Sequence, residues 1–188
     1  SYSMTISSLD NKKVKFINSL KLSKKRKEYN MFIVEGMHLV YEAYKHGYLK
    51  EVFLLENEKM EFICSKEINY VTYDVMSKMT SLNNPTNVIG LCDMKNDNKI
   101  LGGKVLLLDG IQDPGNLGTI IRSACAFSVD TIVLSKQCVD LYNEKVISVL
   151  IVGLGHYGME MLKSVLWCGQ MVGYVLKVTV IDDSPDAA

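Results

Sequence analysis

The sequence predicts an α/β protein with two successive units. Short apolar runs alternate with amphipathic stretches between residues 31 and 94, a polar and then glycine-rich segment (KNDNKILGG) follows, and a new strand–turn–helix pattern begins at 104. Such alternation is typical of layered α/β domains. At 188 residues, with 48% hydrophobic and 22% charged residues, the chain is long enough to bury two small cores.

Each element of the first unit is predicted from periodicity. Apolar side chains recur at helical spacing, which predicts helices at 14–30, 38–47, 58–67 and 74–80. Short apolar runs predict strands at 31–36, 51–56, 68–73 and 87–94. In the second unit we expect strands near 104–108 and 131–135, with a helix between them and a loop and helix start at 137–147.

Basic residues gather at the N-terminal end, although the formal net charge of the chain is zero. Residues 1–30 hold eight Lys or Arg against two acids, and residues 31–188 hold thirteen against nineteen. A basic end on an acidic chain indicates a polyanion partner, and a solvated helix face is the alternative. Because a packed domain follows the run KLSKKRK (21–27), nucleic acid stays open beside that alternative.

Composition argues against several classes of protein. The five cysteines are odd in number and form no Cys-x-x-Cys pair, so we expect neither a disulfide framework nor a metal site. The N-terminal residues lack the apolar core of a signal peptide, and the apolar stretches near 146–155 and 165–176 are too short and interrupted to span a bilayer. We therefore expect a cytoplasmic protein with no membrane partner.

The stretch DGIQDPGNLGTIIRSA (109–124) carries the chemistry. Pro114 and Gly115 suit the two central positions of a type II turn, and Asn116 then stands where a helix N-cap is expected. The amides of 117–119 would form an anion site at the positive end of the helix dipole, and Arg122 would lean back toward it. The alternative is a plain strand–turn–helix whose arginine pairs with a surface acid.

This stretch resembles the first signature of the SpoU (TrmH) branch of the SPOUT RNA methyltransferases. The segment SKKRKEYNMFIVEGMHLVYEA resembles the start of that branch's substrate-binding domain, which is related to ribosomal proteins that bind kinked RNA, and NVIGLCDM resembles its closing strand. The resemblance covers residues 5–147. It implies an α/β RNA-binding domain over 1–95, a linker at 96–103, and the first half of a SPOUT-type parallel-sheet domain over 104–147.

The resemblance also implies an activity. Members of the family transfer a methyl group from S-adenosylmethionine to a ribose 2′-hydroxyl of rRNA or tRNA, and they are homodimers. Asn116 and Arg122 stand at the positions of the family's motif asparagine and catalytic arginine. Since a guanidinium is a poor base, we expect Arg122 to hold phosphate and stabilise the developing alkoxide. We expect Asn116 to position the hydroxyl or support the turn.

The RNA would be held by the first domain. We expect phosphate contacts, which set affinity without sequence choice, from four residues: Lys24, Lys25, Arg26 and Lys27. Glu35 and Gly36 match the family's Val-Glu-Gly signature. The alternative for this pair is a strand end with a salt-bridging acid.

From residue 148 the sequence departs from the family pattern. Loops resembling Gly-Ser-Glu-Gly and Ser-Leu-Asn-Val, expected for the cofactor pocket, are not recognised. Residues 148–183 suggest instead a strand, a glycine-rich turn, a helix and a strand, which resembles the first βαβ unit of a Rossmann dinucleotide-binding domain. The residues of that pattern are Gly153, Gly155, Gly158 and Asp182.

We therefore interpret the chain as a truncated methyltransferase joined to a foreign Rossmann-like segment at 148–188, through a mis-joined reading frame or a natural fusion. Two alternatives to an active methyltransferase follow. One is an RNA-binding remnant without turnover, and the other is an NAD(P)-binding fragment that uses the glycine-rich turn and Asp182.

Overall fold

The computed structural model describes residues 4–94, 103–151, 170–171, 174–175 and 177–180. The chain divides into two compact units, Ser1–Met94 and Lys95–Ala188. Each unit is described by itself below. Among the described residues no helix is long and apolar enough to cross a membrane. In the same part of the chain, no group of three or more His, Cys, Asp or Glu side chains could hold a metal ion.

The first unit is built on a four-stranded mixed sheet. Its strands are β1 (Met31–Glu35), β2 (Leu49–Leu55), β3 (Glu67–Val71) and β4 (Val88–Asp93). The order across the sheet is β1-β4-β2-β3; β4 runs antiparallel to both of its neighbours, and β2 and β3 are parallel. These strands confirm the four that periodicity predicted.

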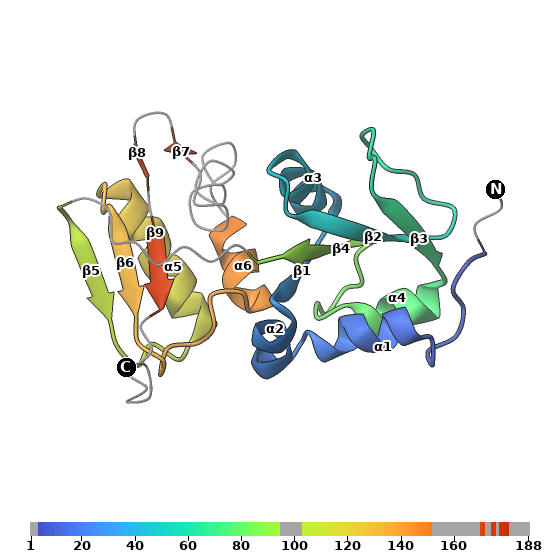
Figure 1. Cartoon of the computed structure of the whole chain (residues 1–188), viewed down its shortest axis with the longest axis horizontal. Helices are drawn as coiled ribbons and strands as arrows, with labels where there is room; N and C mark the ends of the chain where they lie inside the picture. The colour runs from blue at the N-terminus through green and yellow to red at the C-terminus, as the bar shows by residue number, and fades with distance from the viewer. Residues whose placement is uncertain (1–3, 95–102, 152–169, 172–173, 176, 181–188) are drawn as a thin grey trace. The chain divides into compact units, whose positions relative to one another are not determined.

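Helices cover both faces of this sheet (Figure 1). They are α1 (Lys12–Ser19), α2 (Ser23–Tyr29), α3 (Met37–Lys45) and α4 (Tyr73–Met79). Helices α1 and α4 enclose a hydrophobic core on one face, which includes Ile17, Phe53 and Met76. Helix α3 covers the other face, where a Cβ at Gly90 would lie 3.2 Å from Val40 Cγ2 of that helix. This glycine therefore allows α3 to pack closely on the sheet.

Two helix predictions in this unit are wrong. The helix expected at 14–30 is two helices, because Leu22 is extended (φ −90°, ψ 126°) and breaks the run between α1 and α2. No helix forms over 58–67. There the chain turns at Asn57, whose φ is +69°, and Phe62 packs against the rings of Tyr41 and Tyr44 instead. A local apolar period cannot reveal such tertiary contacts.

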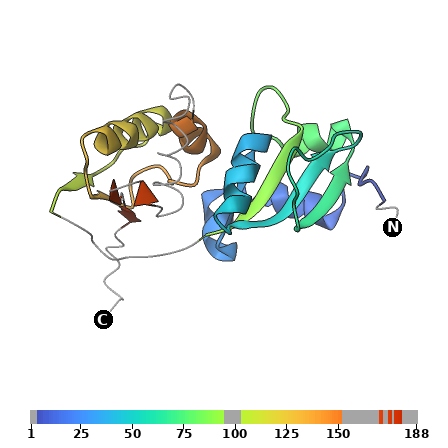
Figure 2. The same cartoon turned by 90° about the horizontal axis from the view of Figure 1, so that it is seen from above.

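The second unit contains a parallel sheet. Strands β5 (Val105–Leu108), β6 (Thr131–Leu134) and β9 (Lys177–Val180) lie in the order β5-β6-β9. Helix α5 (Pro114–Ala126) connects β5 to β6 and packs against α6 (Glu144–Ile151) (Figure 2). A separate antiparallel pair is formed by β7 (Gln170–Met171) and β8 (Tyr174–Val175).

The expected Rossmann-like βαβ unit is wrong at its first strand. Residues 148–151 belong to helix α6, which Asn143 caps by accepting a hydrogen bond of 2.9 Å from the Lys145 N–H. A short apolar run of this kind cannot be assigned to strand or helix from periodicity alone. The later strand does form, as β9, but it pairs with β6 of the parallel sheet. The glycine-rich turn (Gly153, Gly155, Gly158) and Asp182 lie outside the described residues.

Candidate functional site

Helix α5 begins at Pro114, three residues earlier than the sequence predicts. Asp113 caps it: its Oδ1 accepts a hydrogen bond of 2.7 Å from the Asn116 N–H, and its carbonyl accepts one of 3.0 Å from the Leu117 N–H. Pro at the first helical position and Asp immediately before it form a favourable helix start. The expected type II turn and the N-cap at Asn116 are therefore wrong.

The expected anion site must be corrected as well. The Leu117 N–H is bonded to the Asp113 carbonyl, and the next two residues lie inside the helix, where amides bond to carbonyls four residues back. Gly115 is helical, and among the described glycines only Gly36, Gly47 and Gly110 have positive φ. The amides of 117–119 are thus occupied by bonds within the helix and do not form the expected anion site.

Around α5, Arg122 and Asn116 lie on different sides. Leu117, Gly118, Ile121 and Ala124 form the buried face. Arg122 is half-buried at one flank of this face, one turn after Gly118, and Asn116 is exposed. With 3.6 residues per turn the two side chains leave the helix axis about 120° apart. Arg122 can therefore lie over Gly118 as expected, whereas Asn116 presents its amide on the opposite flank.

The loops that follow β5 and β6 are fastened together at the carboxyl ends of these strands. The Gly110 N–H donates to Ser135 Oγ at 3.2 Å, and the Ser135 N–H donates to the Leu108 carbonyl at 2.9 Å. Further along, the Val139 N–H donates to the Ile111 carbonyl at 2.7 Å. In open parallel sheets ligands bind at this end of the strands. Asp113 and α5 begin there too, so the motif lies where a ligand is expected.

In the first unit, α2 presents lysines to solvent. Lys24 and Lys27 are exposed, and among the described residues neither takes part in an ion pair or hydrogen bond. Lys25 pairs with Glu28 at 2.7 Å and lies 5.5 Å from the centre of the Tyr29 ring. The hydrogen bond that Lys25 donates to the Glu28 carboxylate raises the pKa of Lys25. These three lysines form a cationic surface on one short helix.

Arg26 has a different role from the one expected. It is only 1% exposed, and its guanidinium donates to the carbonyls of Leu20 at 2.8 Å and Lys21 at 3.0 Å. Its position among the basic residues predicts a phosphate contact, but burial keeps the side chain away from solvent. Arg26 therefore fastens the turn between α1 and α2, and the expectation of a phosphate contact is corrected.

Glu35 and Gly36 also have structural partners. Glu35 accepts hydrogen bonds from the Ser81 N–H at 2.8 Å and from Thr80 Oγ1 at 3.1 Å, and so ties the end of β1 to the loop after α4. Gly36 has φ +99° immediately before α3, a conformation that favours glycine. The acid at the strand end thus holds a loop through a hydroxyl and a backbone amide.

The structural roles of two residues, Asp113 and Lys21, were not predicted from the sequence. Asp113 was the signal for the true helix start, because an acid directly before Pro fits the N-cap and first helical positions. Lys21 Nζ donates to the carbonyls of Lys78 at 2.8 Å and Thr80 at 3.1 Å, at the end of α4. The local sequence around Lys21 does not indicate these two hydrogen bonds, because they join residues far apart in the chain.

Two family models match this chain. The MRM3-like substrate binding domain matches residues 11–90, and the SpoU rRNA Methylase family matches residues 103–166. The chain belongs to the SpoU rRNA methylase family. The SpoU match extends beyond residue 147, so the prediction that family resemblance ends there is wrong. It also includes the glycine-rich turn, and nothing supports NAD(P) as a ligand.

Several curated proteins are similar to this SpoU family chain. The 23S rRNA (guanosine(2553)-2′-O)-methyltransferase RlmP of Bacillus subtilis is 36% identical over 143 residues, which cover 74% of this chain and 58% of RlmP. The mitochondrial rRNA methyltransferase 3 of Homo sapiens is 25% identical over 160 residues, 76% of this chain and 37% of its own length. This chain thus spans little more than half of RlmP.

Solved structures share the fold. An rRNA methyltransferase from Sinorhizobium meliloti with bound AdoMet superposes with a TM-score of 0.68 at 24% identity, covering 96% of this chain and 66% of that one. The SpoU methyltransferase AviRb from Streptomyces viridochromogenes, in complex with AdoMet, gives 0.70 at 19% identity, covering 93% and 64%. At these identities the likeness establishes the SpoU fold.

Proposed function

We propose that this protein is an S-adenosylmethionine-dependent ribose 2′-O-methyltransferase that acts on structured rRNA. The observation that carries the proposal is the position of Arg122 on α5, one turn after Gly118, in a helix that begins at the carboxyl end of β5. Family membership supports the reaction class. The 36% identity to a 23S rRNA methyltransferase supports rRNA as the substrate class.

The described residues fit S-adenosylmethionine in their chemistry. The loop from β6 to α6 lies against the loop from β5 to α5 through the bond between Val139 and Ile111. At the start of α6, Glu144 Oε1 is buried and has no hydrogen-bond partner among the residues that the structure describes. A carboxylate oxygen of this kind suits the amine or the hydroxyls of the cofactor, and we propose Glu144 as one residue that would hold it. When bound, S-adenosylmethionine supplies an electrophilic methyl group.

Arg122 would hold the RNA backbone beside the reacting ribose. Its planar fork of donors matches a phosphate, and its charge would stabilise the oxygen as the hydroxyl loses its proton. Because a guanidinium does not release its proton near neutral pH, Arg122 would act through position and charge. Asn116 would orient the ribose from the other flank of α5, where its exposed amide can donate and accept.

The RNA would be gripped by the α2 lysines. Lys24 and Lys27 are exposed and have no partner among the described residues, so binding a phosphate breaks no described contact. Such contacts set affinity and make it depend on salt. Buried Arg26 is not part of this surface. We expect the functional protein to be a homodimer, which sedimentation of the full chain would test.

Calorimetry with S-adenosylmethionine and filter binding with a 23S rRNA fragment test the proposal together. We expect the full chain to bind both ligands. The double substitution K24E/K27E should weaken RNA binding and lower the slope of log K against log salt by about two or more. Lys45→Glu, an exposed lysine on α3, is the control. RNA binding without cofactor binding would indicate a non-catalytic RNA-binding protein and contradict the proposal.

A further inference from the structure

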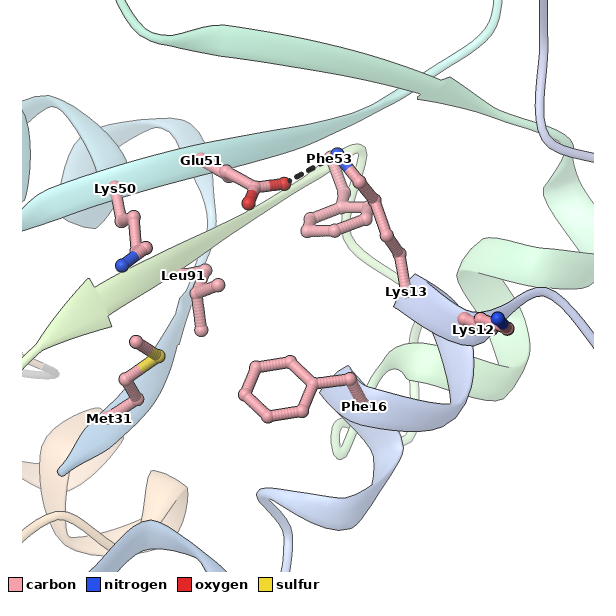
Figure 3. A pocket seen from close by; sticks show the side chains of 8 residues that line it. All are labelled: Lys12, Lys13, Phe16, Met31, Lys50, Glu51, Phe53 and Leu91. Carbon is pink, nitrogen blue, oxygen red and sulfur yellow. Dashed lines mark hydrogen bonds and ion pairs between the residues drawn. The ribbon is translucent and has the colours of Figure 1, made fainter. Parts of the chain in front are cut away.

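A pocket of about 240 Å³ opens on the first unit between α1 and the sheet (Figure 3). Its apolar wall comes from Phe16 on α1 and from Met31, Phe53 and Leu91 on three strands. Phe16 points across the space toward Met31 and Leu91. Phe53 and Leu91 are buried, whereas Phe16 and Met31 are partly open to solvent. The pocket therefore offers a flat aromatic ring beside an apolar floor.

Lysines surround this apolar wall. Lys12, Lys13 and Lys50 line the pocket, against Glu51 as its one acid. Lys13 is fixed by ion pairs with Glu67 at 2.7 Å and Glu51 at 2.9 Å. Burial lowers the pKa of Lys13, but the hydrogen bonds that its ammonium donates to these two carboxylates, together with their charges, outweigh that effect and raise the pKa. Lys13 is therefore charged and held in place at neutral pH.

The other two lysines are available to a ligand. Lys12 is exposed and has no ion pair or hydrogen bond within the described part of the chain. Lys50 is exposed and lies 3.9 Å from Asp93, a surface pair that contributes little binding energy. Anionic groups bound on the two sides of the pocket would therefore each meet one of these cations without displacing a strong partner. The charge of the mouth favours a ligand that carries phosphate.

The pocket adjoins the basic helix α2. The ring of Tyr29, at the end of α2, packs edge to face against Phe16 with the ring centres 4.9 Å apart. Lys25 lies over that same tyrosine. One chain of contacts thus leads from the α2 lysines through Tyr29 to the aromatic wall of the pocket. A nucleic-acid strand following the lysines would pass its mouth.

We propose that this pocket receives a single unstacked base of the substrate RNA, while Lys12 and Lys50 contact the phosphates on either side. The inference rests on the proposed function, because it takes RNA to be the substrate. Drug-sized ligands fill pockets of about 300–1,000 Å³, so this smaller pocket suits one ring system. Single-stranded RNA is held in this way elsewhere, by aromatic side chains that stack on bases beside cations that bind the backbone.

Binding of an rRNA fragment to the full chain tests the pocket. Phe16→Leu keeps an apolar side chain but removes the ring, and we expect it to weaken binding about tenfold without changing the salt slope. Lys12→Glu should weaken binding and lower the slope. Tyr41→Leu and Lys45→Glu, which change an aromatic and a cation on α3 across the sheet, should leave both quantities unchanged.

A crosslink identifies the occupant. RNA transcribed with 4-thiouridine should crosslink on irradiation to peptides that contain Phe16 or Met31. Crosslinks only elsewhere, together with unchanged binding by Phe16→Leu, would overturn the pocket but leave the proposed function standing. Failure of the unsubstituted chain to bind RNA would overturn both. Micromolar binding of free mononucleotides without an RNA crosslink would assign the pocket to a free nucleotide and contradict this inference.

Discussion

Asp113 and Asn116 are joined by a hydrogen bond of 2.7 Å from the backbone N–H of Asn116 to Asp113 Oδ1. This bond sets where α5 begins, and so it sets the position of every later side chain on that helix. A side chain at Gly115 would place its Cβ 3.1 Å from the same oxygen. The Asp-Pro-Gly-Asn sequence therefore starts the helix that carries Arg122.

Asp113→Ala removes the cap of α5. We expect the second unit to lose about 1 kcal/mol of unfolding free energy, the usual cost of an N-cap lost to alanine. Asp113→Asn retains an acceptor and should lose much less. Urea unfolding, followed by a probe in the second unit, measures both. Equal stability of the alanine variant and the unsubstituted chain would show that the bond does not fix the helix start.

Arg122 should affect turnover far more than folding. Arg122→Ala removes the proposed phosphate contact and charge, and we expect methyl transfer to fall by about 10²–10³-fold. Arg122→Lys should recover little of this rate, because a lysine lacks the planar fork. Lys104→Ala, an exposed lysine before β5, is the matched control. Single-turnover rates with saturating cofactor would reveal the difference, and full activity of Arg122→Ala would exclude the assigned role.

Arg26 and Lys27 are neighbours that should behave in opposite ways. Arg26→Met leaves two backbone carbonyls without their donor, and we expect it to destabilise the first unit by about 2 kcal/mol or more. Lys27→Met should leave stability nearly unchanged and weaken RNA binding. Thermal unfolding and filter binding of both variants provide the comparison. The reverse result would restore Arg26 as an RNA contact.

Cys92 should be the slowest of three cysteines to react with iodoacetamide. It is completely buried on β4, and burial raises the pKa of its thiol well above the usual value, with the charge of Asp93 adding to the effect. Cys64 and Cys138 are partly exposed. Mass spectrometry of the folded protein at pH 8 would follow each site. Early labelling of Cys92 would mean that β4 opens readily.

The same thiol makes stability depend on pH. A pKa that folding raises means that the folded state keeps its proton while the unfolded state loses it, above about pH 8.5. The free energy of unfolding should therefore fall as pH rises from 8.5 to 10. Cys92→Ala should make that fall smaller. Urea titrations at both pH values test this, and identical pH dependence of the two proteins would contradict it.

Much of the fold could be predicted from the sequence. The four strands of the first unit follow from short apolar runs, and the family was recognised from one long motif around Arg122. Local patterns failed where distant contacts decide the structure. Phe62 packs on the tyrosines of α3 and forms no helix, and the guanidinium of Arg26 is buried against carbonyls five and six residues away. The local sequence around Phe62 and Arg26 reveals neither the ring packing nor the buried hydrogen bonds.

The tail shows a second limit of local patterns. Residues 148–151 read equally well as a strand or as the end of a helix, and the interpretation as a Rossmann strand depended on the glycines that follow. The cap at Asn143 and the packing of α6 on α5 decide for the helix. The match of the SpoU family through residue 166 agrees with one continuous methyltransferase sequence over that range.

The most direct test is the position of the methyl group on the product. The full chain is incubated with 23S rRNA and methyl-labelled S-adenosylmethionine, and the RNA is then hydrolysed in alkali. A 2′-O-methyl group prevents cleavage of the adjacent phosphodiester, so we expect the label in alkali-resistant dinucleotides, and its loss with Arg122→Ala. Label in mononucleotides, which indicates a methylated base, or no label at all would contradict ribose methylation by this protein.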